Sequence, residues 1–99
     1  MKKNIGKPKP YPHVGHFLKR KRIAAGLSQR QVCEALGYSS TQFISNWERG
    51  LASPPMGALA RLVQIYKIGK NDFMEEMMRD KKLAIEGELG LAFRRRLKA

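Results

Sequence analysis

The chain is poor in cysteine and in long apolar runs. Its 99 residues include one cysteine, Cys33, so no internal disulfide can form, which agrees with a reducing cytoplasm. No stretch of about 18 apolar residues occurs, so we expect no membrane-spanning helix. The basic N-terminus has no apolar run behind it and does not match a secretory signal. We therefore expect a cytoplasmic protein without membrane attachment.

The residues needed for metal binding and for catalysis are also scarce. Cys33, His13 and His16 are too few for a metal site, and their spacing matches no common zinc pattern. No nucleophile stands near a plausible base, no carboxylate pair lies in a glycine-rich frame, and no phosphate loop occurs. We expect no metal, no cofactor and no enzymatic activity.

Acidic residues are few, and the excess of basic ones is large. Twenty Lys and Arg face eight Asp and Glu, giving a net charge of +12. From Met1 to Arg30 there are nine basic residues and no acidic one. Such a surface attracts polyanions, namely DNA, RNA or an acidic membrane. The basic segments lack a strong aromatic face, which disfavours the membrane.

The length fits one domain, and the spacing of apolar residues predicts helices without strands. A first helix is expected from Val14 to about Ala25, ended by Gly26 in a left-handed cap. Its inward residues would be Val14, Phe17, Leu18 and Ala25. A second helix follows, capped by Ser28 and closed by Gly37, with Gln31 completing a capping box.

Three more helices are expected further along. Ser40 is the best N-cap for a third, running over 41–49. Pro54 and Pro55 suit the start of a fourth, and Gly69 would break it. Its buried stripe would be Met56, Leu59, Leu62, Val63 and Tyr66. Asn71 or Asp72 can cap a fifth helix beginning with Phe73, which either continues or gives way to a sixth helix near Glu88.

An apolar stripe follows the C-terminal segment at spacing close to four residues. Its members are Met74, Met78, Ile85, Leu89, Phe93 and Leu97. The stripe would form a dimer seam, bind a protein partner or pack onto the protein's own core.

The second and third helices, joined by a turn at Gly37, match a helix-turn-helix unit. Val32, Cys33, Leu36, Ile44 and Trp47 would point inward. The third helix then presents neutral hydrogen-bonding side chains outward, namely Thr41, Gln42, Ser45 and Asn46. Amides and hydroxyls can read base edges in the major groove, although the same row could be an ordinary solvated face.

The order of residues in 14–68 resembles the lambda-repressor-like, or Xre-type, helix-turn-helix family. The run LSQ, then LGY, then WERG, then a proline carries the resemblance as a set. The contributing residues are Leu18, Arg22, Gly26, Leu27, Ser28, Gln29, Val32, Leu36, Gly37, Ile44, Trp47, Glu48, Arg49, Gly50, Pro54, Leu59 and Leu62.

The resemblance implies an all-α, five-helix DNA-binding domain, here with a helical C-terminal extension. It implies base contacts from Thr41, Gln42, Asn46 and the neighbouring Ser45. It also implies a partly buried salt bridge between Arg22 and Glu48. The candidate phosphate contacts are Lys19, Ser28, Gln29, Ser40 and Arg49.

Three departures from the family pattern affect the expected site. Cys33 stands where alanine is usual, as a small apolar filler or a redox-sensing thiol. The turn from Gly37 to Ser40 is one residue longer than in the phage repressors, so a shift of register would exchange Gln42 and Phe43. Phe43 would contact thymine methyls or fold onto Tyr38. The loop after the third helix, 51–53, lacks the usual basic residues.

We divide the chain into a flexible basic arm (1–13), a helix-turn-helix domain (14–69) and a C-terminal helical segment (70–99). The arm would touch phosphates or enter a minor groove, or would be an ordinary terminus. The predicted function is a sequence-specific double-stranded DNA-binding transcriptional regulator, a repressor, acting as a homodimer. The alternative is an antitoxin-like or adaptor protein whose C-terminal segment binds a protein partner. RNA binding through the basic tails is a further variant.

Overall fold

Five helices form the protein, as seen in a computed structural model that describes residues 9–98. They are α1 (Pro12–Ala24), α2 (Gln29–Leu36), α3 (Gln42–Glu48), α4 (Met56–Tyr66) and α5 (Lys70–Lys98). Residues 9–98 contain no strand, and the expected all-α, five-helix fold is confirmed. Lys2, Lys3 and Lys7 of the predicted arm lie outside the described residues.

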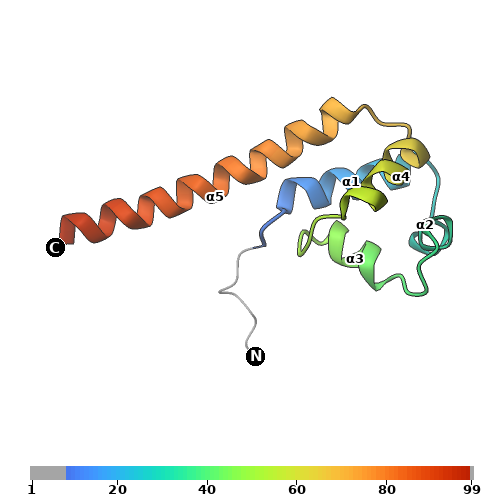
Figure 1. Ribbon diagram of the computed structural model, residues 1–99, viewed down its shortest axis with the longest axis horizontal. Helices are drawn as coiled ribbons and strands as arrows, with labels where there is room; N and C mark the ends of the chain where they lie inside the picture. Colours follow the sequence, from blue (N-terminus) through green and yellow to red (C-terminus); the bar gives the residue numbers. More distant parts are fainter. Residues whose placement is uncertain (1–8, 99) are drawn as a thin grey trace.

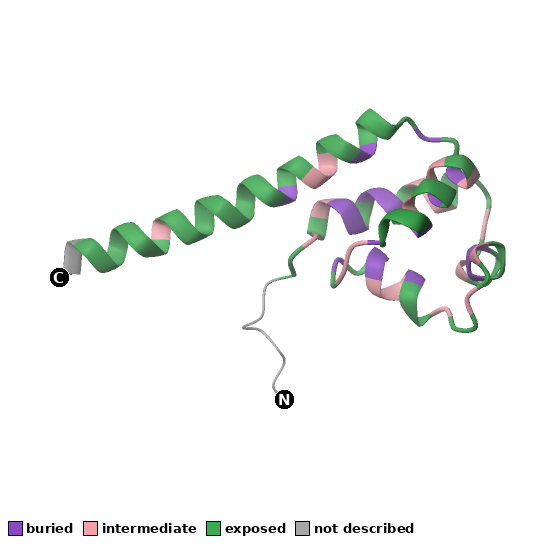
Figure 2. Ribbon diagram, in the orientation of Figure 1, coloured by how far each residue is buried: buried purple, intermediate pink, exposed green. Residues whose placement is uncertain are grey.

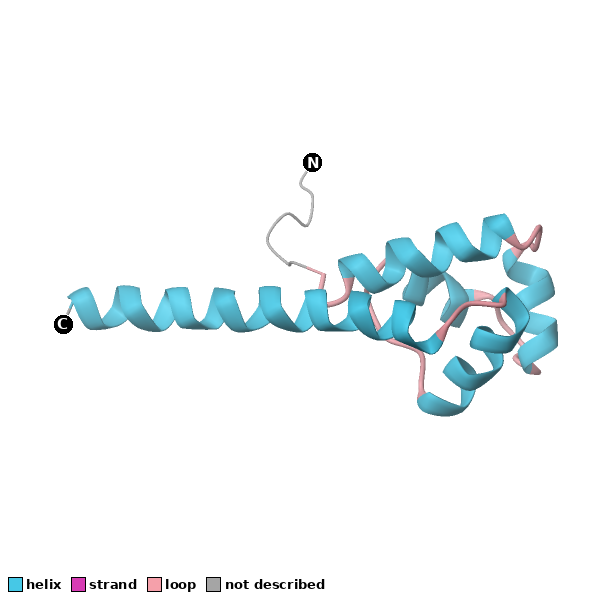
Figure 3. Cartoon of the chain, turned by 90° about the horizontal axis from the view of Figure 1, so that it is seen from above, coloured by secondary structure: helices cyan, strands magenta, loops and turns pink. Residues whose placement is uncertain are grey.

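Helix α1 is the centre of the fold. It contacts α3, α4 and α5, while α2 contacts α3. Helix α5 runs back along α1 and then extends well past the body formed by the other helices (Figures 1 and 3). Colouring by burial shows buried residues on α1 to α4 and at the start of α5, whereas the rest of α5 is almost wholly exposed (Figure 2).

The core is small and mostly aliphatic and aromatic. Its buried members are Val14, Phe17, Leu18, Val32, Cys33, Ile44, Trp47, Ala58, Leu62, Tyr66, Ile68 and Phe73. Burying a large side chain of this kind contributes about 1.5–3 kcal/mol. Two predicted core residues are wrong. Ala25 follows the last residue of α1 and is exposed, and Met56 begins α4 and is 78% exposed.

The junction between α4 and α5 differs from the prediction. Helix α4 ends at Tyr66 because Lys67, not Gly69, adopts the left-handed conformation, with φ of 53°. A non-glycine residue there carries strain of about 1–2 kcal/mol. Helix α5 then begins at Lys70, three residues before the predicted Phe73, which places Asp72 in its first turn.

Helix α5 is a single helix of 29 residues. Of the two alternatives for the C-terminal segment, continuation of the fifth helix is therefore right. Gly87 and Gly90 lie within it, at a cost of roughly 1 kcal/mol each relative to alanine. No helix among the described residues is long and apolar enough to cross a membrane.

A buried carboxylate on α5 caps the start of α1. Asp80 is 3% exposed. Its Oδ1 accepts the backbone N–H of His13 at 3.0 Å and lies 2.9 Å from His13 Nδ1, and its Oδ2 accepts the N–H of Val14 at 2.9 Å. The local N-cap position of α1, Tyr11, offers no side-chain bond of its own. Helix α5 thus satisfies N–H groups that a helix start leaves without partners.

Candidate nucleic-acid interface

Helix α2 begins with the predicted capping box. Ser28 Oγ accepts the backbone N–H of Gln31 at 3.0 Å, and Gln31 Oε1 accepts the N–H of Ser28 at 2.9 Å. Each side chain satisfies a donor that the first turn of a helix leaves free. The prediction of Ser28 as N-cap is confirmed.

The turn between α2 and α3 starts as the sequence predicts. Gly37 has φ of 77°, and the N–H of the next residue, Tyr38, bonds back to Cys33 O at 3.0 Å. This left-handed ending suits glycine, since it has no Cβ. Cys33 itself is 1% exposed and fills the core, with its thiol donating to Tyr38 O at 3.1 Å.

The start of α3 lies slightly later than predicted. Helix α3 begins at Gln42, and the preceding Thr41 is already near helical geometry and makes no side-chain cap bond. Ser40 is therefore not the N-cap, although its Oγ accepts the backbone N–H of Gln42 at 3.0 Å. The hydroxyl supports the first turn from one residue further out.

The inner face of α3 is anchored in the core. Ile44 and Trp47 are 1% and 3% exposed. The ring of Tyr38 lies edge-on to Trp47, with centroids 5.9 Å apart, an arrangement that aromatic pairs favour. These contacts fix which side of α3 remains available to a ligand.

Because Gly15 has no side chain, the backbone of α1 can pack directly against the backbone at the end of α3. A Cβ placed on Gly15 would lie 2.7 Å from both Glu48 O and Gly50 N. The N–H of Tyr11 also bonds to Gly50 O at 3.0 Å, so the start of α1 is joined directly to the second residue after α3. Gly15 is not among the residues predicted from the sequence to shape the site. The available signal was a glycine inside a helical pattern, which often has a packing reason.

A charged network links the first three helices. Arg22 Nε lies 2.6 Å from Glu48 Oε2, and Arg22 Nη2 donates to Glu48 Oε1 at 3.1 Å. Arg22 Nη1 donates to Leu27 O at 2.8 Å, and Gln29 Nε2 donates to Glu48 Oε1 at 3.0 Å. The side chain of Glu48 thus has partners on α1 and α2.

The same pair affects nearby protonation. The hydrogen bond to Glu48 raises the pKa of Arg22. Burial, with a further effect of the Glu48 carboxylate, raises the pKa of Tyr66 well above its ordinary value. Both shifts favour a charged Arg22 and a neutral Tyr66, so the ion pair sits beside an uncharged phenol.

The four predicted base-reading side chains lie on α3 and at its start, since Thr41 directly precedes the helix and Gln42, Ser45 and Asn46 are within it. Gln42 is exposed, and Thr41, Ser45 and Asn46 are half-buried. Gln42 Nε2 donates to Asn46 Oδ1 at 3.0 Å. This bond uses one of the two N–H groups on Gln42 and one lone pair on Asn46. Each amide therefore keeps a free donor and a free acceptor, held in place by the other.

Phe43 lies beside this face. Its ring meets Tyr38 edge-on with centroids 5.2 Å apart, so it does fold against Tyr38, yet it remains 54% exposed. Contact with a thymine methyl stays a prediction, because the exposed part of the ring is still available.

The predicted phosphate-contacting residues lie on several elements. Lys19, Ser28, Ser40 and Arg49 are exposed, on α1, at the start of α2, in the turn and directly after α3. Gln29 is half-buried and gives one amide N–H to Glu48. Phosphate contact by these five residues stays a prediction.

Arg61 is a second residue that supports the motif and was not predicted. Arg61 Nη2 on α4 donates to Ala35 O at 2.8 Å, near the C-terminal end of α2. A cation there interacts favourably with the helix dipole and a free carbonyl. Within the described part of the chain, no group of three or more His, Cys, Asp and Glu could hold a metal ion.

These features define a helix-turn-helix protein. The helix-turn-helix domain family matches residues 13–73, more than half of the chain, and the chain belongs to this family. The helix-turn-helix domain that the sequence predicted is thereby confirmed.

Solved structures share this fold. The clp gene regulator ClgR from C. glutamicum has a TM-score of 0.61 and 22% identity, covering 78% of this chain and 97% of that chain. A second ClgR structure gives the same TM-score and identity over 86% of this chain and 90% of its own. The restriction-modification controller protein C.Esp1396I has a TM-score of 0.56 and 16% identity, covering 75% and 94%. No curated protein matches the chain significantly.

Proposed function

We propose that this protein is a DNA-binding transcriptional regulator that reads the major groove with α3. The observation that supports this most directly is the outer face of α3. Its two amides, Gln42 and Asn46, are joined by a 3.0 Å hydrogen bond on a helix held at its far end by Gly15 and Arg22. A rigid helix with neutral donors and acceptors suits base readout, since amides can pair bidentately with adenine.

The charge of the chain supports the same proposal. A net charge of +12 favours a polyanion. Exposed Lys19 and Arg49, with the hydroxyls of Ser28 and Ser40, would contact phosphates and set the register of α3. Gln29 would add its remaining amide atoms. The structural neighbours ClgR and C.Esp1396I are described as a gene regulator and a controller protein.

Two copies would act together on DNA. One short helix reads few base pairs, so we expect a homodimer on two half-sites about 34–36 Å apart. A dimer bound across a promoter would exclude the transcription machinery, and we propose repression as its mode of action. Such a regulator works in the cytoplasm, where it meets the chromosome.

The exposed stripe on α5 favours a second candidate, an antitoxin-like or adaptor protein. Met78, Leu89 and Phe93 are 64%, 52% and 61% exposed. Stable co-purification of a different small protein, lost on Leu89→Glu, would favour this candidate.

The proposed function is tested by selecting bound duplexes from a random DNA library at about physiological salt, where nonspecific binding is weak. We expect an enriched inverted repeat. Gln42→Ala and Asn46→Ala should each relax the preference at one base position, by about 1–3 kcal/mol, with little loss of stability. No enrichment, or an unchanged site in both variants, would contradict reading by α3.

The charge contribution needs its own variant. Replacing Lys19 with Ala should weaken binding to all sequences alike and reduce the slope of log affinity against log salt by about one unit. Gln64→Ala, an exposed change on α4, is the matched control and should leave both unchanged. A loss confined to one sequence would show that Lys19 reads bases. The same titration applied to Lys2, Lys3, Lys7 and Lys9 separates phosphate contact from groove reading by the arm.

A further inference from the structure

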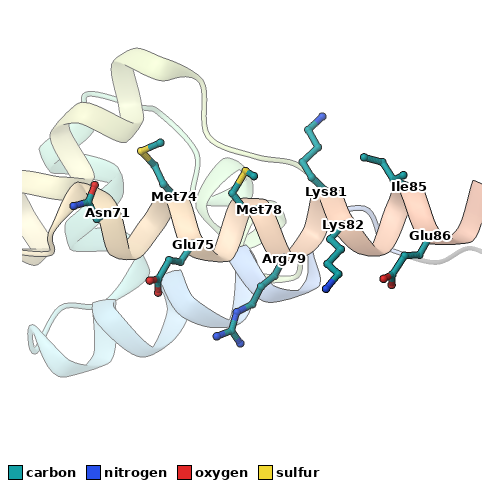
Figure 4. Close-up of a pocket in the computed structure, with 9 residues that line it drawn as sticks. All are labelled: Asn71, Met74, Glu75, Met78, Arg79, Lys81, Lys82, Ile85 and Glu86. Carbon is teal, nitrogen blue, oxygen red and sulfur yellow. The ribbon is translucent and has the colours of Figure 1, made fainter.

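The outer stripe of α5 is an apolar surface that the protein's own core does not cover. Phe73 and Asp80 are buried and mark the side of α5 that faces the core. Met74, Met78 and Ile85 point to another side, along a hollowed surface (Figure 4). They are 55%, 64% and 53% exposed, and Leu89 and Phe93 continue the stripe. Packing onto the protein's own core, one of the three alternatives, is therefore wrong for these residues.

We propose that α5 pairs antiparallel with α5 of a second copy of this chain through this stripe. The stripe from Met74 to Phe93 spans about 28 Å of helix at 1.5 Å per residue. Lys81 and Lys82 interrupt the stripe between Met78 and Ile85 (Figure 4), and their aliphatic stems can cover apolar surface. An exposed apolar surface of this kind marks an interaction site. This proposal rests on the proposed function in one respect, because both expect two copies of the chain to act together.

Charge along α5 selects the direction of pairing. From Lys70 to Asp80 the helix has four acidic and two basic residues, whereas 91–98 has four basic residues and no acidic one. Antiparallel pairing brings the acidic end of each copy beside the basic end of the other. Parallel pairing would place the two basic ends together, which costs free energy. The gradient also suits the dipole of α5 itself, but that effect is limited to the terminal turns and does not require an apolar stripe.

The residue pattern selects one register. An antiparallel pair centred between residues 83 and 84 puts Met74 level with Phe93 of the second copy, and Met78 level with Leu89. At this centre Ile85 lies level with Lys82 of the second copy. Lys81 and Glu88 are centred within one residue of the same point, as are Lys82 and Glu86, and all four side chains are exposed. The two apolar pairs thus set the register, and the two charged pairs are centred within one residue of it.

A hollow between α4 and α5 can receive Phe93 of the second copy. It has a volume of about 490 Å³. Its apolar lining includes Met56, Leu59, Val63, Met74, Met77 and Met78. Methionine side chains adapt to an inserted group and make favourable sulfur–aromatic contacts. Met74, level with Phe93 of the second copy, borders this hollow. The pairing also accounts for the 78% exposure of Met56, which has no core role.

The direction and register are tested by cross-linking the full chain without DNA. In a Cys33→Ser background, Met78→Cys and Leu89→Cys are prepared as separate proteins. Under mild oxidation we expect a disulfide-linked dimer when the two proteins are mixed, and little from either alone. Cross-linking of each protein with itself would mean parallel pairing, and no cross-linking in any sample would mean no such seam. Either result overturns the proposal.

The seam itself is tested by sedimentation over a range of concentrations. Leu89→Glu should raise the dimer dissociation constant at least about tenfold, because pairing would bury an unpaired carboxylate. Leu91→Glu is the matched control, since Leu91 is 49% exposed but lies about 200° around the helix. Equal effects of both changes, or a monomeric wild-type chain up to about 100 μM, would overturn the proposal. Circular dichroism checks that both variants keep their helix content.

These outcomes are independent of the DNA-reading proposal. A Leu89→Glu monomer should still bind a single half-site, with reduced affinity for the double site. Loss of all selectivity in Gln42→Ala with an intact dimer would instead point to the reading face.

Discussion

The body formed by α1 to α4 and the distal part of α5 use the same kinds of residue in opposite ways. In the body, Glu48 is 9% exposed and bonded to Arg22 and Gln29. On distal α5, Glu86 and Glu88 are exposed. Among the described residues, no buried side-chain nitrogen or oxygen is left without a partner. Charged side chains in the body are therefore buried with partners inside the protein, whereas those on distal α5 face solvent.

The largest expected difference between the two regions concerns a carboxylate. Glu48→Gln removes the charge that compensates Arg22, whose side chain is only 12% exposed. Losing one partner of a buried pair costs about 3–5 kcal/mol. Glu86→Gln, on the exposed helix, should change stability by less than about 0.5 kcal/mol. Urea unfolding of both variants compares their free energies of unfolding. Equal midpoints would show that the Arg22–Glu48 pair does not stabilise the packing of the helices.

The next contrast concerns glycine. Gly15→Ala forces a Cβ to within 2.7 Å of backbone atoms at the end of α3 and just after it, and overpacking of this kind costs about 1–3 kcal/mol. Gly87→Ala meets nothing within 4 Å and should instead favour the helix by about 0.5–1 kcal/mol. Thermal unfolding followed by circular dichroism should show opposite signs. Destabilisation by both changes would mean that distal α5 is more crowded than its exposure indicates.

A smaller effect is expected where the two regions join. Asp80→Ala removes the acceptor for the N–H groups of His13 and Val14, and loss of a helix cap costs about 0.5–2 kcal/mol. Asp80→Asn keeps one oxygen acceptor and should lose less. Hydrogen exchange at the first turn of α1 measures the local effect. Unchanged protection there in Asp80→Ala would show that water replaces the cap at no cost.

Local features of the fold could be predicted from the sequence. Ser28 and Gln31 lie three residues apart and form their capping box without help from other elements. The family resemblance added the order of the helices. The weaker predictions concern helix ends. Lys67 ends α4 in place of Gly69 because surrounding contacts can hold a lysine in a strained conformation, which propensity alone does not indicate.

Contacts between distant residues could not be predicted in the same way. Asp80 meets His13 across 67 positions, and Gly15 meets Gly50 only because α1 crosses the end of α3. No sequence period relates these residues. The stripe on α5 was visible from the sequence, but whether it faced the core depended on the path of α5 along α1. For the candidate site, the sequence named the face of α3 and not the bond between Gln42 and Asn46.

The cap supplied by Asp80 also determines where this chain can be divided. The helix-turn-helix family match ends at residue 73, seven positions before Asp80. A fragment cut at that boundary would keep the reading helices but lose the acceptor that completes the first turn of α1. The smallest self-sufficient unit therefore ends inside α5, after Asp80. A fusion that transfers the helix-turn-helix domain to another protein, or a chimera that exchanges its C-terminal helix, must therefore keep the first part of α5 through Asp80.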